Sequence, residues 1–354
     1  MLLLENIPLA PLTTIKIGGP AKYFVEARTA GEVQEAVAFA CSRDLPVFVL
    51  GGGSNLLVAD TGWPGLVLKI AIQGINQVQR SGHDDGKILF DAGAGESWDK
   101  FVCHAVMARC AGVECLSGIP GSVGGTPVQN VGAYGQEVAE TITSVQVLDL
   151  RDKDGQVREL CPEACGFSYR ASIFNTSERG RFIVLRVTYA LTPGGNPRIS
   201  YADLKRHFEG RETPPDLAET REAVRHIRAC KGMLITPGDP DCLSAGSFFK
   251  NPVLSEEHHE DLKRRAAARG LTLPRYPALE TRKKVSAAWL VERSGFSKGF
   301  GFGRVGISTK HALAIVNRGG ATAADVLTLK EQIQHRVEEI WGVRLEPEPV
   351  VVGF

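Results

Sequence analysis

The stretch Pro46-Val-Phe-Val-Leu-Gly-Gly-Gly-Ser-Asn55 decides the fold class of this 354-residue chain. Its apolar first half, residues 46–50, predicts a buried strand, and the glycines at 51–53 predict a turn with exposed backbone amides. A strand that runs into such a turn can cradle a phosphate group. The triple glycine by itself is equally typical of a tight strand-exit turn, because the chain contains 39 glycines.

The sequence on both sides of this stretch predicts a mixed α/β region. Residues 29–43 are expected to form a helix, because Thr29 and Glu32 can make a capping box. Its apolar face comprises Val33, Ala36, Val37 and Ala40. The glycine spacing differs from G-x-G-x-x-G, so a Rossmann dinucleotide site is a poor fit. Two further strands and a helix that ends near Gly112 are expected at residues 66–70, 88–91 and 97–109.

A second glycine-rich stretch, residues 118–135, contains six glycines together with Pro120 and Pro127. So many helix and strand breakers predict an ordered loop. Two glycine-rich loops of this size suit a long diphosphate ligand such as FAD, since both offer backbone N–H groups without side chains in the way. Beyond them, residues 144–150 and 156–160 flank Asp154-Gly155 as a hairpin, and residues 182–191 predict an apolar strand. The middle of the chain is therefore expected to be rich in antiparallel sheet.

The last third of the chain has the composition of charged helices, with a boundary expected near residue 232. Gly270 and Gly342 are placed where they would end two of these helices. Residues 343–354 predict a terminal strand interrupted by a bend at Glu346-Pro-Glu-Pro349. The expected helices cover residues 217–230, 255–269, 285–294 and 322–341.

Composition excludes several function classes. The 41 Lys and Arg residues nearly balance the 40 Asp and Glu residues, without a basic run of the kind that neutralises a nucleic acid backbone. Neither a secretory leader nor an apolar run long enough to span a membrane is apparent, so a cytoplasmic protein is expected. The eight cysteines lack C-x-x-C pairs and a zinc-finger histidine partner, which indicates reduced thiols and no metal site.

Six motifs, in order along nearly the whole chain, are similar to those of the UDP-N-acetylenolpyruvoylglucosamine reductases, the MurB enzymes. The segment 246–252 is the most specific of them. The motifs are Leu50-Gly-Gly-Gly-Ser-Asn-Leu-Leu57, Gly118-Ile-Pro-Gly-Ser-Val-Gly-Gly125, Gln129-Asn-Val-Gly-Ala-Tyr-Gly-Gln136, Tyr169-Arg-Ala-Ser-Ile-Phe174, Gly246-Ser-Phe-Phe-Lys-Asn-Pro252 and Leu345-Glu-Pro-Glu348.

The resemblance implies an α+β fold. A vanillyl-alcohol-oxidase-type FAD-binding domain would consist of two α+β subdomains, residues 1–72 and 73–231, followed by an α/β substrate-binding domain at residues 232–342. The terminal strand at 343–354 would return to the first subdomain. Tyr201 resembles the tyrosine of the longer form of the family, which folds over the nucleotide diphosphate. An aromatic residue packed beside a strand end is the alternative interpretation of Tyr201.

The resemblance also implies the chemistry, that of a UDP-N-acetylmuramate dehydrogenase. NADPH would reduce non-covalently bound FAD, which would then pass hydride to C3 of UDP-N-acetylglucosamine enolpyruvate for peptidoglycan synthesis. Ser247 resembles the residue that protonates C2, and Arg170 with Glu348 resembles the pair that stabilises the carboxylate. A guanidinium can bind a carboxylate in bidentate geometry, which suits Arg170. The alternatives are a turn hydroxyl for Ser247, a structural ion pair for Arg170 and Glu346 in place of Glu348.

The ligand contacts that the resemblance implies fall into two groups. Val350 stands where the family often has a flavin-contacting arginine, and Arg228 is the candidate to replace it. The cofactor-binding residues are Gly51, Gly52, Gly53, Ser54, Asn55, Leu56, Gly118, Ile119, Pro120, Gly121, Gly124, Gly125, Gln129, Asn130, Gly132, Ala133, Tyr134, Gly135 and Arg228. The substrate-binding residues are Tyr169, Tyr201, Lys231, Asn251, Tyr276 and Lys284, with Arg282 and Lys283 as neighbours that compete with Lys284 for this role.

Two rival functions remain at this point. An oxidase on the same flavin fold would pass electrons to oxygen and would not need the proton donor Ser247. A flavin- or nucleotide-sugar-binding protein without catalysis would be expected to have lost Ser247, Arg170 or Glu348, and all three are present. A structural role fares worst, since exposed glycine loops lower stability without a ligand to order them. The family implies a monomer, and the composition argues against nucleic acid and membrane partners.

Overall fold

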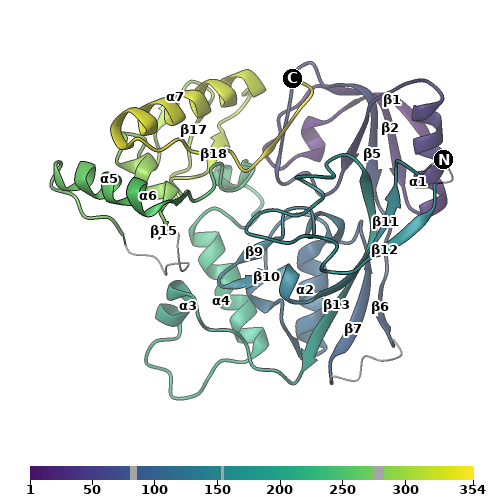
Figure 1. Ribbon diagram of the computed structural model, residues 1–354, viewed down its shortest axis with the longest axis horizontal. Coiled ribbons are helices and arrows are strands. Elements are labelled where there is room, and N and C mark those ends of the chain that lie inside the picture. Colours follow the sequence, from purple (N-terminus) through teal and green to yellow (C-terminus); the bar gives the residue numbers. More distant parts are fainter. Residues whose placement is uncertain (80–85, 153–154, 275–282) are drawn as a thin grey trace. The chain divides into compact units, whose positions relative to one another are not determined.

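The computed structural model describes residues 1–79, 86–152, 155–274 and 283–354 (Figure 1). The chain divides into two compact units. The first unit comprises Met1–Ile7, Ala21–Gly53 and Trp63–Cys230, and the second comprises Pro8–Pro20, Ser54–Gly62 and Lys231–Phe354. The division cuts the first glycine motif between Gly53 and Ser54. Among the helices of the described residues, none has both the length and the apolar content needed to cross a bilayer.

One sheet of the first unit surrounds the strand that precedes the triple glycine. Its strand order is β1 (Leu3–Pro8), β2 (Pro20–Ala27), β5 (Trp63–Ile70) and β3 (Val47–Leu50), and both β2 and β3 pair in parallel with β5. The prediction of a strand at 46–50 is confirmed. The prediction that this strand is buried is wrong for most of it, because β3 lies at the sheet edge and is half-buried except at Leu50.

Helix α1 (Ala30–Cys41) connects β2 to β3 and buries Val33, Ala36 and Ala40. Thr29 Oγ1 accepts the Glu32 N–H at 3.2 Å, as predicted for an N-cap. The second half of the predicted capping box is wrong. The Glu32 carboxylate accepts the N–H of Arg28 at 2.6 Å, one residue before the N-cap.

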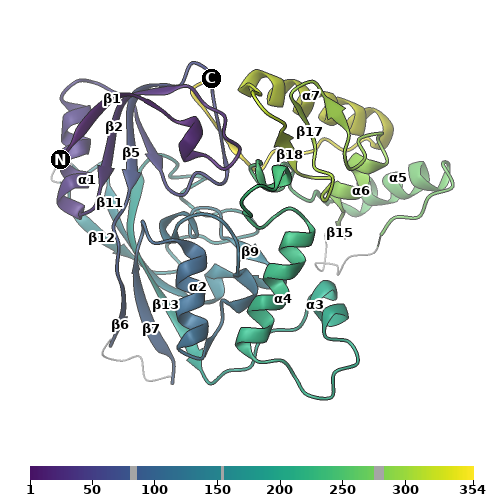
Figure 2. The ribbon, with the colours of Figure 1, turned by 180° about the vertical axis from the view of Figure 1, so that it is seen from behind.

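The first unit also contains a larger antiparallel sheet. Its order is β12 (Val157–Leu160), β11 (Ile142–Asp149), β13 (Phe182–Pro193), β7 (Ile88–Gly93) and β6 (Ile75–Val78), and β8 (Cys110–Ala111) also pairs with β13. The predicted hairpin and antiparallel middle are confirmed, although Asp154 of the hairpin turn lies outside the described residues. Helices α2 (Trp98–Met107) and α4 (Leu217–Cys230) lie side by side in both views (Figures 1 and 2), and α3 (Ala202–His207) packs on α4.

The core of this unit contacts the glycine-rich stretch of residues 118–135 through a hydrogen bond. Trp98, Phe101 and Tyr189 stack in one aromatic group, with the Phe101 and Tyr189 centroids 4.6 Å apart. The Tyr189 hydroxyl is fully buried and hydrogen-bonds Thr126 Oγ1 at 2.7 Å. Thr126 follows the short 3-10 helix η3 (Val123–Gly125) within the stretch that was predicted to be an ordered loop. The loop is therefore tied to the core of the sheet.

The second unit contains most of the predicted charged helices. Helices α5 (Glu256–Ala267), α6 (Ala287–Glu292) and α7 (Ala323–Trp341) pack with a sheet of β16 (Gly301–Phe302), β17 (Val305–Ile307) and β18 (Ile315–Asn317). Thr322 and Asp325 form a capping box at the start of α7, and Gly342 ends it with φ of 68°. The predicted helices exist, each at most two residues shorter at either end.

The last strand of the chain returns to the first glycine motif. Strand β19 (Val350–Val352) pairs in parallel with β4 (Leu56–Val58), which begins one residue after Asn55. This pairing explains why Ser54–Gly62 groups with the C-terminal part of the chain. A terminal strand interrupted by a bend was predicted over residues 343–354; the part after the bend is confirmed, and the part before it, residues 343–346, is not a strand. A short pair of β14 (Val253–Leu254) and β15 (Lys283–Lys284) completes this unit.

Candidate functional site

The glycines of two predicted loops meet inside the first unit. We name residues 51–55 the first glycine loop and residues 118–125 the second glycine loop. A Cβ on Gly52 would lie 2.5 Å from Gly121 Cα, and a Cβ on Gly51 would lie 2.9 Å from Ser122 Oγ. The loops therefore touch backbone to backbone, a contact that side chains at these positions would prevent.

Ser122 was not among the predicted site residues, but its hydroxyl makes it a candidate. Its hydroxyl is one of two buried side-chain polar atoms, among the described residues, without a hydrogen-bond partner. A buried hydroxyl without a partner costs free energy unless a ligand satisfies it. Ser122 lies within the quoted motif of residues 118–125, so its position between the glycines was the available signal.

The second glycine loop is held at its first residue by groups from two helices. The Gly118 N–H donates to Asp99 Oδ1 of α2 at 2.6 Å, and Arg228 Nε of α4 donates to the Gly118 carbonyl at 3.1 Å. Burial lowers the pKa of the Arg228 guanidinium, and its interaction with Tyr134 opposes this shift. Arg228, predicted to contact the cofactor, thus lies between the second glycine loop and Tyr134.

A third loop carries an unusual backbone. In the Tyr134 loop, residues 129–136, Asn130 and Tyr134 adopt φ values of 44° and 49°. Arg170, with φ of 55°, donates from Nη1 to the Asn130 carbonyl at 3.4 Å and from Nη2 to the Gly132 carbonyl. Left-handed backbone at residues other than glycine is strained and is concentrated at functional sites. Arg170 is therefore held on the Tyr134 loop by its own guanidinium.

Two predicted substrate tyrosines are exposed and contact either the Tyr134 loop or Arg170. The Tyr201 side chain is 43% exposed, and its ring meets the Tyr134 ring edge-to-face with centroids 5.4 Å apart. Tyr169 is also exposed, and the Arg170 guanidinium lies 5.4 Å from its ring centroid. Both tyrosines thus contact a residue of the Tyr134 loop or its partner Arg170.

The backbone segments that carry the predicted proton donor and the predicted glutamate pair with each other inside the second unit. The segment around Ser247 pairs with residues 345–348: the Glu348 N–H donates to the Phe248 carbonyl, and the Lys250 N–H donates to the Glu346 carbonyl, both at 2.9 Å. Glu348 is half-buried opposite the residue that follows Ser247. Glu346 has a side chain that is 78% exposed and lies 3.8 Å from Lys250 Nζ.

The second half of the first glycine loop belongs to this same arrangement. Asn55 Nδ2 donates to the Glu348 carbonyl at 3.3 Å, and the Val350 N–H donates to the Asn55 carbonyl at 2.9 Å. Asn251 is partly committed to structure, since its Oδ1 accepts the Ala287 N–H at the start of α6 at 3.0 Å. The predicted substrate residue Tyr276, like Arg282, lies outside the described residues.

The sequence shows which protein family has these loops. The model of the UDP-N-acetylenolpyruvoylglucosamine reductase C-terminal domain matches residues 239–352, and that of an FAD binding domain matches residues 21–160. UDP-N-acetylenolpyruvoylglucosamine reductases of Thermobifida fusca and Streptomyces coelicolor are 44% and 45% identical to this chain, over 99% of it and over 98% and 90% of their own lengths. The chain belongs to the UDP-N-acetylenolpyruvoylglucosamine reductase family.

A solved structure extends this similarity to the fold. The crystal structure of the Thermus caldophilus UDP-N-acetylenolpyruvylglucosamine reductase, MurB, matches with a TM-score of 0.66 and 28% identity, covering 99% of this chain and 98% of that one. The predicted family and its α+β fold are confirmed, as are the flavin-dependent oxidoreductase class and the FAD cofactor.

The residues of the first unit fit FAD. The two glycine loops expose the backbone at Gly52 and Gly125, and the partnerless Ser122 hydroxyl is buried between these loops. Backbone amides and a hydroxyl without bulky side chains are the donors that a diphosphate needs. The third element of the fit is the Tyr134 loop, where strained backbone is held by Arg170.

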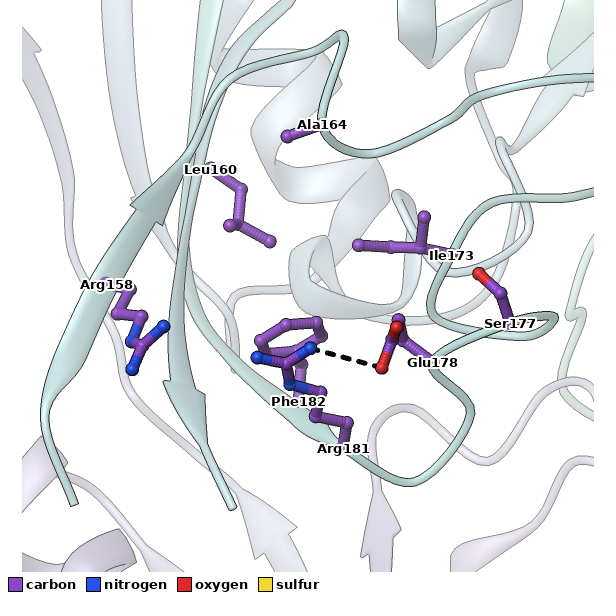
Figure 3. Close-up of a pocket in the computed structure, with 8 residues that line it drawn as sticks. All are labelled: Arg158, Leu160, Ala164, Ile173, Ser177, Glu178, Arg181 and Phe182. Carbon is purple, nitrogen blue, oxygen red and sulfur yellow. Dashed lines mark hydrogen bonds and ion pairs between the residues drawn. The ribbon is translucent and has the colours of Figure 1, made fainter. Parts of the chain in front are cut away.

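A pocket of about 310 Å³ lies elsewhere in the first unit (Figure 3). Leu160, Ile173 and Phe182 supply apolar walls, and Arg158 and Arg181 line its charged side. Both guanidiniums are already paired, each with the buried carboxylate of Asp149. None of the predicted site residues lines this pocket, so it is separate from the loops described above.

Proposed function

We propose that the protein reduces UDP-N-acetylglucosamine enolpyruvate to UDP-N-acetylmuramate with NADPH, for peptidoglycan synthesis. The observation that carries this proposal is the pairing of the Ser247 segment with the Glu348 segment inside the second unit. A flavin oxidase would not need an acid and a carboxylate partner on one paired element. The family membership and the six ordered motifs support the same reaction.

The residues of this chain are proposed to act on the substrate carboxylate and on C2. FAD, when bound, supplies the hydride carrier between NADPH and the substrate. Hydride addition at C3 leaves an electron pair at C2 that is delocalised into the adjacent carboxylate. Arg170 and Glu348 stabilise that charge, and the Ser247 hydroxyl gives its proton to C2. The net reaction consumes NADPH and one proton from solvent, which reprotonates Ser247.

The nucleotide part of the substrate is assigned to residues with donors. Lys231, Asn251 and Lys284 are half-buried and offer N–H groups suited to phosphate oxygens, with Tyr201 covering the diphosphate. Tyr169 and Tyr276 complete the proposed substrate contacts. In this proposal residues 1–72 and 73–231 bind FAD, residues 232–342 bind the UDP-sugar, and residues 343–354 return to the first subdomain.

A single anaerobic trace tests the proposal. The purified flavoprotein is reduced with NADPH, substrate is added, and flavin reoxidation is followed by absorbance in the wild type, in Ser247→Ala and in Ser297→Ala, an exposed serine of the same unit. Wild type and Ser297→Ala should reoxidise at once, and Ser247→Ala should be reduced normally but reoxidise about 10²–10⁴ times more slowly. Reduced wild type that ignores the substrate but reacts with oxygen would instead establish the oxidase.

A further inference from the structure

A buried carboxylate outside the proposed reaction joins three segments of the first unit. The Glu114 side chain, at 1% exposure, accepts N–H donors from Gly112 at 2.8 Å, from Gln136 Nε2 at 2.7 Å and from the Arg198 backbone at 2.9 Å. Three hydrogen bonds to one buried carboxylate satisfy its oxygens and fix the donors in place. Each donor belongs to a different stretch of the chain.

Gln136 connects Glu114 to the Tyr134 loop. Its Oε1 accepts the Cys115 N–H at 2.8 Å while its Nε2 donates to Glu114. Both ends of the amide are therefore committed to neighbouring residues of one turn. Gln136 begins β10 (Gln136–Glu137), directly after Gly135, so the end of the Tyr134 loop is fixed on Glu114.

Arg198 contacts Glu114 and two residues next to Glu114 and Gln136, and its guanidinium also pairs with Glu140. Its N–H binds Glu114, its carbonyl accepts the Cys115 thiol at 3.1 Å, and its Nη1 donates to the Gly135 carbonyl at 2.8 Å. Burial raises the pKa of the Cys115 thiol, which keeps it protonated and able to donate. The segment that begins at Arg198 is thus anchored to the residue that ends the Tyr134 turn.

The tyrosine segment, residues 198–201, continues from this anchor onto the Tyr134 turn. A Cβ on Gly135 would lie 2.6 Å from Ser200 Oγ, so the turn and the segment are in close contact. Tyr201 then meets the ring of Tyr134 edge-to-face. We infer that Glu114 is a positioning residue that seats the tyrosine segment on the Tyr134 loop, and so couples the substrate-covering Tyr201 to a flavin-binding loop. This inference rests on the proposed roles of Tyr201 and the Tyr134 loop.

The test compares two buried carboxylates of the same unit. Glu114→Gln places an amide N–H₂ among N–H donors. The matched control is Asp149→Asn, whose carboxylate is also 1% exposed and also accepts three N–H donors, from Arg151 and Arg181. For FAD-loaded protein we would measure the Kd of UDP by calorimetry, amide hydrogen exchange of residues 198–201 and the unfolding temperature.

Glu114→Gln is expected to raise the Kd of UDP about tenfold and to speed hydrogen exchange at residues 198–201. Asp149→Asn should lower the unfolding temperature without either change. If Glu114 acts through Tyr201, adding Glu114→Gln to Tyr201→Ala should weaken UDP binding no further, because coupled residues are not additive. Equal effects of Glu114→Gln and Asp149→Asn on UDP binding, or full additivity with Tyr201→Ala, would overturn the inference.

A second variant keeps the test decisive if Glu114→Gln does not fold. Arg198→Met retains the backbone donor to Glu114 and removes the half-exposed guanidinium from the Gly135 carbonyl and from the exposed carboxylate of Glu140. It should raise the Kd of UDP about threefold with the unfolding temperature unchanged. If wild type neither binds UDP nor reduces the substrate, the proposed function fails. Unchanged hydrogen exchange at residues 198–201 in Arg198→Met would separately overturn the seating of this segment on the Tyr134 loop through Arg198.

Discussion

Replacing the Asp99 carboxylate by an amide should both loosen the second glycine loop and destabilise the first unit. Asp99 accepts two N–H donors from Arg221 at 2.7 and 2.9 Å, one from Arg225 at 2.8 Å and the Gly118 N–H at 2.6 Å. Asp99→Asn keeps one acceptor oxygen, places an N–H₂ beside the cations and removes the negative charge. Arg221, on α4, would then be a buried cation without its carboxylate.

The magnitude follows from how deeply the pair is buried. The Arg221 side chain is 10% exposed and the Asp99 side chain 29% exposed. Breaking a fully buried pair costs about 3–5 kcal/mol and an exposed pair at most about 1 kcal/mol, so we expect Asp99→Asn to lower the free energy of unfolding by about 2–3 kcal/mol. An exposed control, Glu219→Gln, which removes the partner of Arg211, should cost less than about 1 kcal/mol.

The pH dependence distinguishes this charge effect from lost packing. Burial raises the pKa of Asp99, but the hydrogen bonds from Arg221 and the Gly118 amide outweigh it and hold the pKa below its ordinary value of 3.8. A carboxyl group whose pKa is lower in the folded protein than in the unfolded chain stabilises the fold at pH values above the unfolded pKa. This stabilisation is lost as the pH falls through the folded pKa. The difference between wild type and Asp99→Asn should therefore be full at pH 6 and shrink below about pH 4.

Urea unfolding of the FAD-loaded proteins between pH 3 and 7 measures this difference, and calorimetry on the apoproteins measures FAD affinity. We expect Asp99→Asn to weaken FAD binding about tenfold, because Gly118 loses the acceptor that fixes the start of its loop. A difference in unfolding free energy that does not vary with pH, or FAD affinity equal to that of wild type, would refute this account of Asp99.

Two further substitutions test the two glycine loops. Gly52→Ala should weaken FAD binding at least about tenfold, because the added Cβ would lie 2.5 Å from the second glycine loop. The control Gly31→Ala in α1, where the nearest atom is 3.9 Å from the added Cβ, should leave the FAD affinity unchanged. Calorimetry with FAD measures both affinities. Ser122→Ala should raise the free energy of unfolding of the apoprotein by about 1 kcal/mol, because it removes a buried hydroxyl without a partner, and it should weaken FAD binding. A variant that binds FAD as tightly as wild type would contradict a contact between this hydroxyl and FAD.

Local signals predicted the elements whose stabilising contacts are themselves local. Helix α7 begins at the Thr322 cap and ends at Gly342 as expected, because caps and chain reversals depend on residues three or four positions apart. Helix α4 has the predicted bounds for a similar reason. Strands β1, β2 and β6 and helix α3 were not predicted, because their sequences lack clear caps or alternation. These elements are stabilised by their sheets and by α4.

The assignment of site residues depended on motifs, since no local rule distinguishes Glu348 from Glu346. In the structure Glu348 pairs beside the Ser247 segment, while Glu346 faces Lys250 in solvent. That difference comes from the register of two segments about 100 positions apart in the chain. The half-buried state of β3 has the same kind of cause, because the edge position of a strand depends on the order of the whole sheet.

The sequence by itself determined the family, the flavin chemistry of that family, most helices and the antiparallel middle, because motif order, capping and periodicity are written in neighbouring residues. Only the tertiary structure decided that Gly52 touches Gly121, that the Ser122 hydroxyl is buried and that Glu114 binds Gly112, Gln136 and Arg198. These contacts join residues that are mostly tens of positions apart, and their energies arise from burial and from hydrogen bonds that exist only after the chain has packed.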